Sequence, residues 1–189
     1  MDNCHCLSYS YPMSTQEYER LALLTESDYK ILLGKFRESL AQGNEQNITS
    51  IWYVADAVKE YVKLDHNHTH ATAKLVYKNK DEFSRTELET PIQIEELNGL
   101  DAILTKALKG DRYVSEQIRH DFFTPEKLSI SLKYTTDMKW HVEIEAPKSL
   151  GFEDSARLVE QFAQKFGLKL LSEAEEKKLY DEMIAARKS

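Results

Sequence analysis

The sequence has few cysteines, no long apolar run and no excess of basic residues. Each of these features argues against a class of protein. Its only cysteines, Cys4 and Cys6, flank His5. Two thiols with this spacing do not make a structural zinc site by themselves, so a polar tail is the main interpretation and metal binding the alternative. No apolar stretch approaches the roughly 20 residues that cross a bilayer, and no signal-peptide pattern is visible. We therefore expect a cytoplasmic protein that does not associate with membranes.

Net charge and chain length indicate which partners and how many domains to expect. The chain carries 25 basic and 32 acidic residues, which gives a formal net charge of -7. Nonspecific nucleic-acid binders usually show a basic excess, so we expect no such binding here. A chain of 189 residues with 41% hydrophobic content fits one domain with a substantial core. We predict a disordered leader over residues 1–14 and a single domain over residues 15–189.

Hydrophobic periodicity and turn signals predict alternating strands and helices. Thr25 and Asp28 have the spacing of a helix N-cap pair, Ser172 and Glu175 have that of a capping box, and Gly110 and Gly167 suit helix ends. Polar stretches predict loops at 42–47, 65–70 and 79–81. The predicted strands are 17–24, 48–54, 58–64, 72–78, 83–89, 113–123, 127–134 and 139–146. The predicted helices are 25–41, 94–109, 153–166 and 173–187.

This order of elements favours an antiparallel α+β domain, because the strands are interrupted by one helix at a time and few long crossovers are available. Apolar residues of the last two helices, such as Phe162, Phe166, Tyr180 and Met183, are expected to pack inside the domain. A homodimer contact is the alternative role for them. The chain shows no internal repeat and no linker long enough to divide it.

Glutamates separated by one residue occur three times within predicted strands. In a strand, residues two apart project from the same face, so each pair aims two carboxylates in one direction. Burying such carboxylates inside a closed sheet is costly unless cations neutralise them. We therefore expect divalent metals or basic side chains beside the pairs, which are Glu17 and Glu19, Glu87 and Glu89, and Glu143 and Glu145.

The surroundings of these pairs resemble a known family. The segment Glu17-Tyr18-Glu19-Arg20-Leu21 resembles the opening of the CYTH superfamily, the triphosphate tunnel metalloenzymes, whose signature is Glu-x-Glu-x-Lys. Ser84-Arg85-Thr86-Glu87-Leu88-Glu89 is similar to the family's Arg-x-Glu-x-Glu strand. Val142-Glu143-Ile144-Glu145 is similar to its Glu-Ile-Glu strand. The order of elements agrees from about residue 15 to the C-terminus.

The resemblance implies an antiparallel eight-stranded β-barrel whose lumen is a tunnel, with helices packed outside. It implies Mg²⁺ or Mn²⁺ as cofactor and a small triphosphate as substrate, with metals and basic side chains offsetting the phosphate charge. The implied catalytic residues are Glu17, Glu19 and Glu143. The implied metal ligands are Glu17, Glu19, Glu87, Glu89, Glu143 and Glu145. The candidate substrate-binding residues are Arg85, Arg119, Lys63, Lys78 and Lys133.

Two departures from the family pattern leave alternatives open. Leu21 stands where the signature has lysine, and the strand before Glu143 lacks an aspartate that many members carry, with Lys133 near that place. The leading hypothesis is metal-dependent hydrolysis of inorganic tripolyphosphate or a nucleoside triphosphate. Adenylyl cyclase and thiamine triphosphatase activities remain open within the same family. The main alternative is a catalytically weakened tunnel that binds a nucleotide, a polyphosphate or a phosphorylated partner, and a purely structural interaction domain is more distant.

Three alternating histidines, His66, His68 and His70, form a second candidate metal site. Imidazole is a common metal ligand, and alternation in a strand would place the three rings on one face. They fall in a predicted hairpin connection, however, where polar residues are expected anyway. An ordinary polar turn is therefore the preferred interpretation.

Overall fold

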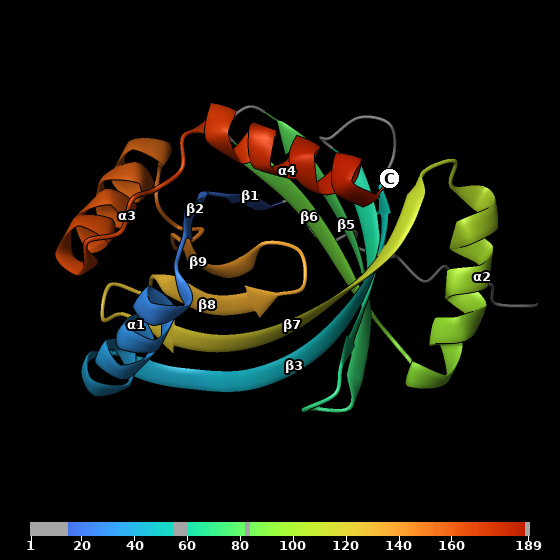
Figure 1. Cartoon of the computed structure of the whole chain (residues 1–189), viewed down its shortest axis with the longest axis horizontal. Coiled ribbons are helices and arrows are strands. Elements are labelled where there is room, and N and C mark those ends of the chain that lie inside the picture. Colours follow the sequence, from blue (N-terminus) through green and yellow to red (C-terminus); the bar gives the residue numbers. More distant parts are fainter. Residues whose placement is uncertain (1–14, 55–59, 82–83, 188–189) are drawn as a thin grey trace, which may run out of the picture.

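The computed structural model describes residues 15–54, 60–81 and 84–187. It consists of one strongly curved antiparallel sheet with helices packed around it (Figure 1). The strands are β1 Thr15–Glu17, β2 Glu19–Leu23, β3 Ala41–Val54, β4 Glu60–Asn67, β5 Thr72–Asp81, β6 Ser84–Ile92, β7 Asp111–Phe123, β8 Ser129–Thr135 and β9 Lys139–Glu145. The helices are α1 Glu26–Ser39, the short 3₁₀ turn η1 Ile94–Glu96, α2 Leu97–Ala107, α3 Phe152–Phe166 and α4 Glu173–Arg187.

The two ends of the sheet are joined through a single residue. The strand order is β1-β6-β5-β4-β3-β7-β8-β9-β2, and every neighbouring pair is antiparallel. β1 and β2 stand at opposite ends of this order but are consecutive in the chain, with Tyr18 between them. One interrupted strand therefore bridges both edges. Counted once, it gives the expected eight-stranded arrangement, although the described hydrogen-bond ladder stays open between β1 and β2.

The two longest strands connect the halves of the molecule. β3 and β7 pair along almost their whole length, and Figure 1 shows both curving from the wing that contains β8 and β9 to the wing that contains β5 and β6. The pairing shifts register between Gln42 and Glu45. This region, 42–47, was expected to be a loop, and that prediction is wrong: its polar residues belong to β3, which pairs with β7 on both sides of the register shift.

The main hydrophobic core lies between the outer face of β7–β9 and the helices α1 and α3. Phe36 of α1 is fully buried, with its ring 5.4 Å from that of Phe122 and 4.9 Å from that of Phe166. Ile130 and Val142 complete the sheet side of this core. The predicted packing role of Phe162 and Phe166 is confirmed. Placing the core on the outer face leaves the inner face of the sheet to polar residues.

The helix boundaries follow local capping chemistry. Thr25 Oγ1 accepts a hydrogen bond from the Asp28 backbone N–H at 3.1 Å, as the N-cap prediction required. Gly167 ends α3 at φ 67°, and the Ser172 hydroxyl and Glu175 form the predicted capping box. The prediction that Gly110 caps the second helix is wrong, because α2 ends at Ala107 with Leu108 as its cap.

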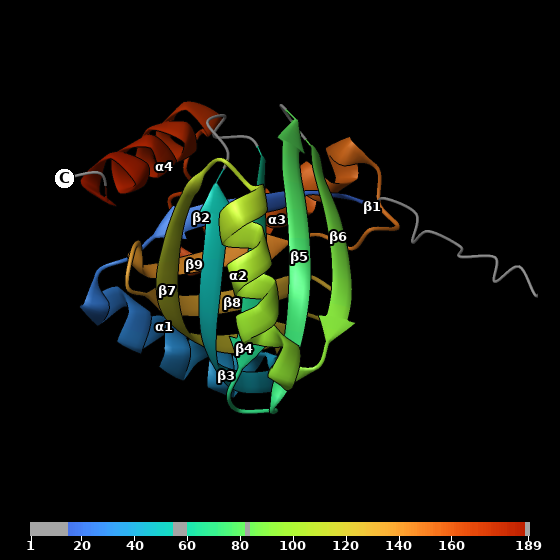
Figure 2. The same cartoon turned by 90° about the vertical axis from the view of Figure 1, so that its right-hand side faces the viewer.

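Helix α2 covers the outer face of the other wing (Figure 2). The Tyr53 hydroxyl on β3 donates to Asp101 Oδ1 at 2.6 Å, and Arg112 on β7 donates to both oxygens of the same carboxylate. The described part of the chain contains no helix long and apolar enough to cross a bilayer. The expected leader, residues 1–14 with Cys4 and Cys6, lies outside the described residues.

Candidate functional site

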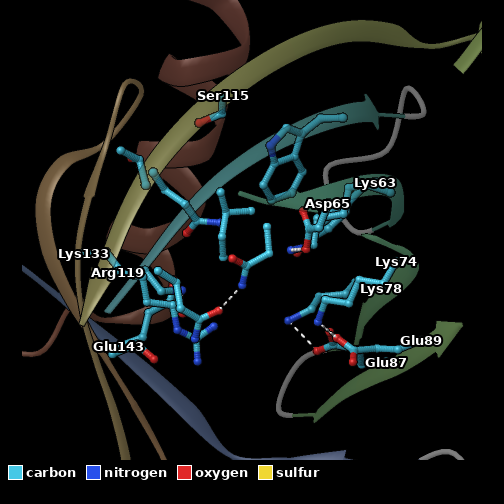
Figure 3. Close-up of a pocket in the computed structure, with 18 of the residues that line it drawn as sticks. Lys63, Asp65, Lys74, Lys78, Glu87, Glu89, Ser115, Arg119, Lys133 and Glu143 are labelled. Atoms are coloured by element: carbon cyan, nitrogen blue, oxygen red, sulfur yellow. Dashed lines mark hydrogen bonds and ion pairs between the residues drawn. The ribbon is translucent and has the colours of Figure 1, made fainter. Parts of the chain in front are cut away.

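A cavity of about 970 Å³ occupies the concave side of the sheet. Its walls come from inward-facing residues of β2 to β9, and Tyr180 and Met183 of α4 also line it. Figure 3 shows basic and acidic side chains from both wings pointing toward one another. The basic lining residues are Lys63, Lys74, Lys78, Arg119, Lys133 and Lys148. The acidic ones are Glu19, Asp65, Glu87, Glu89, Asp137, Glu143 and Glu145.

Strand alternation brings three glutamates, Glu19, Glu143 and Glu145, to one wall. β9 lies between β2 and β8, and its Glu145 is directly opposite Glu19 of β2 and Ser129 of β8. Two residues further along the ladder, Glu143 is opposite Leu21 and Ser131. Because directly opposed side chains on one face lie about 5 Å apart, this wall concentrates carboxylates within a small area.

The most deeply buried charges on this wall form a cluster around Glu143. Lys133, which is only 9% exposed, forms an ion pair with the Glu143 carboxylate. His141 is fully buried, and its Nε2 lies 3.7 Å from the other carboxylate oxygen. Burial alone would raise the pKa of Glu143, but the Lys133 ammonium and the His141 ring hold it well below its ordinary range. Glu143 is therefore ionised and held between two basic groups.

A chain of polar contacts fixes Arg119 beside this cluster. Arg119 Nε donates to Asp121 Oδ1 at 2.5 Å, and the Ser131 hydroxyl donates to the same oxygen at 2.9 Å. Gln46 Nε2 donates to Asp121 Oδ2 at 2.6 Å, and Asn67 Nδ2 donates to the Gln46 oxygen at 2.6 Å. The contacts run from β4 across β3 and β7 to β8. Asp121 of β7 is thus held in place by Gln46 of β3 and Ser131 of β8, and it orients the Arg119 side chain.

The opposite wall carries three lysines, each paired with a carboxylate. Lys63 Nζ lies 2.7 Å from Asp65, whose other oxygen accepts a 2.5 Å hydrogen bond from the Ser50 hydroxyl. Burial acts to raise the pKa of Asp65, but Lys63 and Ser50 bring it below its ordinary value. This buried carboxylate is therefore charged, and it offsets part of the lysine charge on the wall.

The glutamates of β6 complete this wall. Lys78 Nζ lies 2.5 Å from Glu87, and Lys74 is paired with Glu89. Burial and a hydrogen bond with Glu89 raise the pKa of Glu87, while Lys78 opposes the rise. Burial also acts to raise the pKa of Glu89, yet its hydrogen bonds with Glu87 and Lys74 lower it. The two carboxylates are therefore coupled, and Glu87 is the one that takes up a proton more readily.

An aromatic cluster borders the lysine wall. The Trp52 ring stacks on Tyr113 with centroids 5.7 Å apart, and Tyr61 lies against it at 4.8 Å. Lys63 Nζ sits 5.3 Å from the centre of the Trp52 ring. These rings come from three adjacent strands, β7, β3 and β4. Their mutual packing holds Lys63 against its partner Asp65.

Most of the residues predicted from sequence line this cavity. They are Glu19, Glu87, Glu89, Glu143, Glu145, Lys63, Lys78, Arg119 and Lys133. The side chains of Glu17 and Arg85 lie outside the part of the structure whose side chains are described, although their backbones are directly opposite each other across β1 and β6. Whether the lining residues bind metal or substrate stays a prediction.

Several lining residues were not predicted. Lys74 lies four residues before Lys78 on the same strand face, so alternation from the predicted Lys78 could have found it. Asp65 was missed because the expected turn at 65–70 begins too early; β4 continues to Asn67. His141 carried no signal in the sequence beyond its position two residues before Glu143.

Within the described residues, no group of three or more histidine, cysteine, aspartate or glutamate side chains is arranged to hold a metal ion. His66 and His68 have ring centroids 4.1 Å apart, and His68 Nε2 lies 2.8 Å from the Thr49 hydroxyl. The histidines therefore do not form a three-ligand site.

Comparison with known proteins identifies the fold. The sequence matches no protein-family model and no curated protein. The PH1012 protein from Pyrococcus horikoshii OT3 matches with a TM-score of 0.69 and 15% identity over 84% of this chain and 93% of its own. A candidate adenylate cyclase from Bacillus halodurans matches with a TM-score of 0.63 and 12% identity over 84% of this chain and 94% of its own.

A third structure is that of HpAC1 from Hippeastrum, a candidate adenylyl cyclase with a dominant triphosphatase activity. It matches with a TM-score of 0.60 and 16% identity, covering 88% of this chain and 95% of its own. These likenesses extend over nearly the whole length of each protein. They confirm the tunnel fold that the CYTH resemblance implied.

Proposed function

We propose that this protein binds a small triphosphate in the cavity and hydrolyses it with Mg²⁺ or Mn²⁺. The observation that carries the proposal is the composition of the cavity wall, where six basic and seven acidic side chains face one space. A polyphosphate needs cationic side chains along its length, and carboxylates are what a bridging metal needs. The fold shared with HpAC1, which has triphosphatase activity, supports the same assignment.

The charge balance of the wall argues for a metal cofactor. The acidic lining residues outnumber the basic ones, so the wall alone does not attract a polyanion. Mg²⁺ is commonly held by one or two carboxylates together with substrate phosphates rather than by an all-protein cage. The opposed carboxylates of Glu19 and Glu145 fit that requirement. Glu19 and Glu145 would hold the metal, which would offset charge on the phosphates.

The remaining groups have separable roles in this proposal. Arg119, fixed by Asp121, and Lys78, paired with Glu87, donate to phosphate oxygens. Glu143 is ionised, and the low pKa that Lys133 and His141 give it makes it a weak base, so its role is to accept a hydrogen bond from the attacking water and orient it. Such positioning and charge stabilisation supply most of the catalysis in phosphoryl transfer.

A phosphate-release assay tests the proposal. The purified chain is incubated with inorganic tripolyphosphate, ATP and thiamine triphosphate, each with Mg²⁺ or Mn²⁺. We expect metal-dependent release of phosphate from at least one of them. A double variant, Glu19→Gln with Glu145→Gln, controls for contaminating phosphatases. If the wild type releases no phosphate from any of the three, the hydrolytic proposal fails.

A binding module is the second candidate, and Leu21 is the observation that favours it. A leucine cannot donate to a phosphate oxygen, and loss of one positioned donor can slow turnover by about a hundredfold to a thousandfold. In a decayed enzyme, Leu21→Lys raises the turnover rate without tightening triphosphate binding. Calorimetry with tripolyphosphate and Mn²⁺ examines binding separately, and an absence of heat of binding would sink this candidate as well.

A further inference from the structure

Leu21 lies on β2 next to the acidic wall but is not among the residues that line the cavity. It is directly opposite Glu143 in the β2–β9 ladder and is only 3% exposed. By strand alternation it lies on the same face of β2 as Glu19. A lysine at this position would reach the Glu143 carboxylate from β2. The leucine instead leaves that buried carboxylate without a cation from β2.

A lysine of β8, the other strand beside β9, supplies a positive charge next to Glu143. Glu143 is opposite Ser131 of β8, and Lys133 follows Ser131 by two residues on the same face. This diagonal position lets a long side chain reach across, and the Lys133 ammonium is ion-paired with Glu143. Lys133 also feels the attraction of the Glu19 carboxylate. The Lys133 ammonium thus attracts both Glu19 and Glu143, the two glutamates next to Leu21.

Burial makes this pairing obligatory rather than incidental. Removing one partner of a buried ion pair leaves an uncompensated charge, which is far more costly than losing an exposed pair. Position 21 carries an apolar side chain, so the buried Lys133 supplies the ammonium that is paired with Glu143, with Arg119 as the neighbouring cation on this wall. Two lysines, one from β2 and one from β8, would crowd two positive charges onto Glu143.

We propose that Lys133 is the relocated counterpart of the signature lysine: it supplies from β8 the cation that the signature places on β2, and it positions Glu143 toward the bound triphosphate. The inference rests on the proposed function for its catalytic consequence. It treats Leu21 and Lys133 as a compensating exchange, so Leu21 is not a sign of lost activity.

The test uses single and exchanged variants. Hydrolysis of inorganic tripolyphosphate with Mn²⁺ is measured for Lys133→Leu, Leu21→Lys and the double variant Leu21→Lys/Lys133→Leu. We expect Lys133→Leu to lower kcat by about a hundredfold with a smaller change in KM. The kcat of the double variant should be at least about tenfold higher than that of Lys133→Leu. Leu21→Lys alone lowers kcat, whereas a decayed enzyme would gain from it.

A stability measurement makes the result independent of activity. Urea unfolding should show a lower midpoint for Lys133→Leu and a recovered midpoint for the double variant, because the latter restores a cation beside Glu143. Lys30→Leu is the control, since it removes an ammonium that pairs with Glu26 on the exposed face of α1. Its kcat and midpoint should match the wild type.

The outcomes separate the two proposals. If the wild type neither binds nor hydrolyses tripolyphosphate, the proposed function fails, and the urea midpoints still decide whether positions 21 and 133 exchange. If the double variant is no better than Lys133→Leu in both kcat and midpoint, the exchange is overturned. A rise in kcat for Leu21→Lys with Lys133 intact overturns it too. Recovery of the midpoint without recovery of kcat would limit Lys133 to a structural role and overturn its catalytic positioning.

Discussion

Glu19 and Glu145 face each other directly across β2 and β9, so two carboxylates from neighbouring strands point into one cavity. The two residues lie 126 positions apart in the sequence, and the pairing of β2 with β9 brings them together. Each belongs to a different Glu-x-Glu motif. The motifs therefore act on one site rather than on separate strand faces.

This relationship predicts opposite effects of one substitution with and without metal. Glu19→Gln and Glu145→Gln should each weaken tripolyphosphate binding about tenfold to a hundredfold in the presence of Mn²⁺, because a metal-coordinating oxygen is lost. Without metal, the same variants should bind tripolyphosphate at least as tightly as wild type, because the wall has become less negative. Calorimetry with and without Mn²⁺ measures both. Glu116→Gln, at an exposed strand position, is the control and should change neither.

The buried Asp121 carboxylate provides a second prediction. It accepts hydrogen bonds from Arg119, Ser131 and Gln46. Asparagine offers one acceptor oxygen and a donor group in place of the second oxygen, so at least one of the three donors loses its partner. We expect Asp121→Asn to lower the free energy of unfolding by about 1–3 kcal/mol.

Urea unfolding measures this effect against an exposed pair. Asp154→Asn, which removes the exposed Asp154–Arg157 pair on α3, should change the free energy of unfolding by less than about 1 kcal/mol. Equal effects of the two substitutions would show that the network around Arg119 contributes no more than a surface ion pair.

A close approach of β3 to β7 gives a third prediction. A Cβ atom added at Gly43 would lie 2.9 Å from the Phe123 ring, 3.0 Å from Asp121 Cβ and 3.2 Å from the Asp121 carbonyl oxygen. Because the carbonyl belongs to a paired strand, it cannot move freely. We expect Gly43→Ala to destabilise the protein by about 1–3 kcal/mol. Gly34→Ala, in α1 with no atom within 4 Å, should instead stabilise it, by up to about 1 kcal/mol. Thermal melts of both variants reveal the difference in sign.

Gly43 also marks where sequence reasoning reached its limit. A polar segment with a glycine is typical of a loop, and the true strand is visible only once β7 is known to run beside it. The predicted fold held because the apolar faces of the other strands and helices carried clear periodicity. Local patterns cannot report that Gln42 pairs with Phe122, so the length of β3 and the register shift were not predictable.

In the candidate site, too, some features could be predicted from the sequence and others could not. Alternation within single strands grouped the glutamates of each pair on one face, and the family resemblance then selected Glu19 and Glu143 as site residues; both line the cavity. Contacts between strands were not accessible from the sequence. The Lys133–Glu143 pair and the Ser50–Asp65 bond depend on register, and a shift of one residue would reverse the face that each residue occupies.

A last prediction concerns the carboxylate that fastens α2 to the sheet. Hydrogen bonds from Arg112, opposed by burial and aided by the Tyr53 hydroxyl, lower the pKa of Asp101 from 3.8 to about 2. A carboxyl whose pKa is depressed in the folded state stabilises that state above its unfolded pKa, and the contribution disappears as the pH falls through the folded value. The wild type should therefore lose this stabilisation between about pH 4 and pH 2.

Asp101→Asn isolates that contribution, because asparagine does not titrate. We expect the variant to be less stable than wild type at pH 7, where the charged contacts with Arg112 and Tyr53 are fully formed. The difference should shrink as the pH falls from 4 to 2, because the wild type loses the charge of Asp101 over that range, whereas the asparagine has no charge to lose. Urea unfolding at a series of pH values measures both curves. Parallel curves across that range would mean that α2 is held to β3 and β7 by packing, with the Asp101 charge making no net contribution.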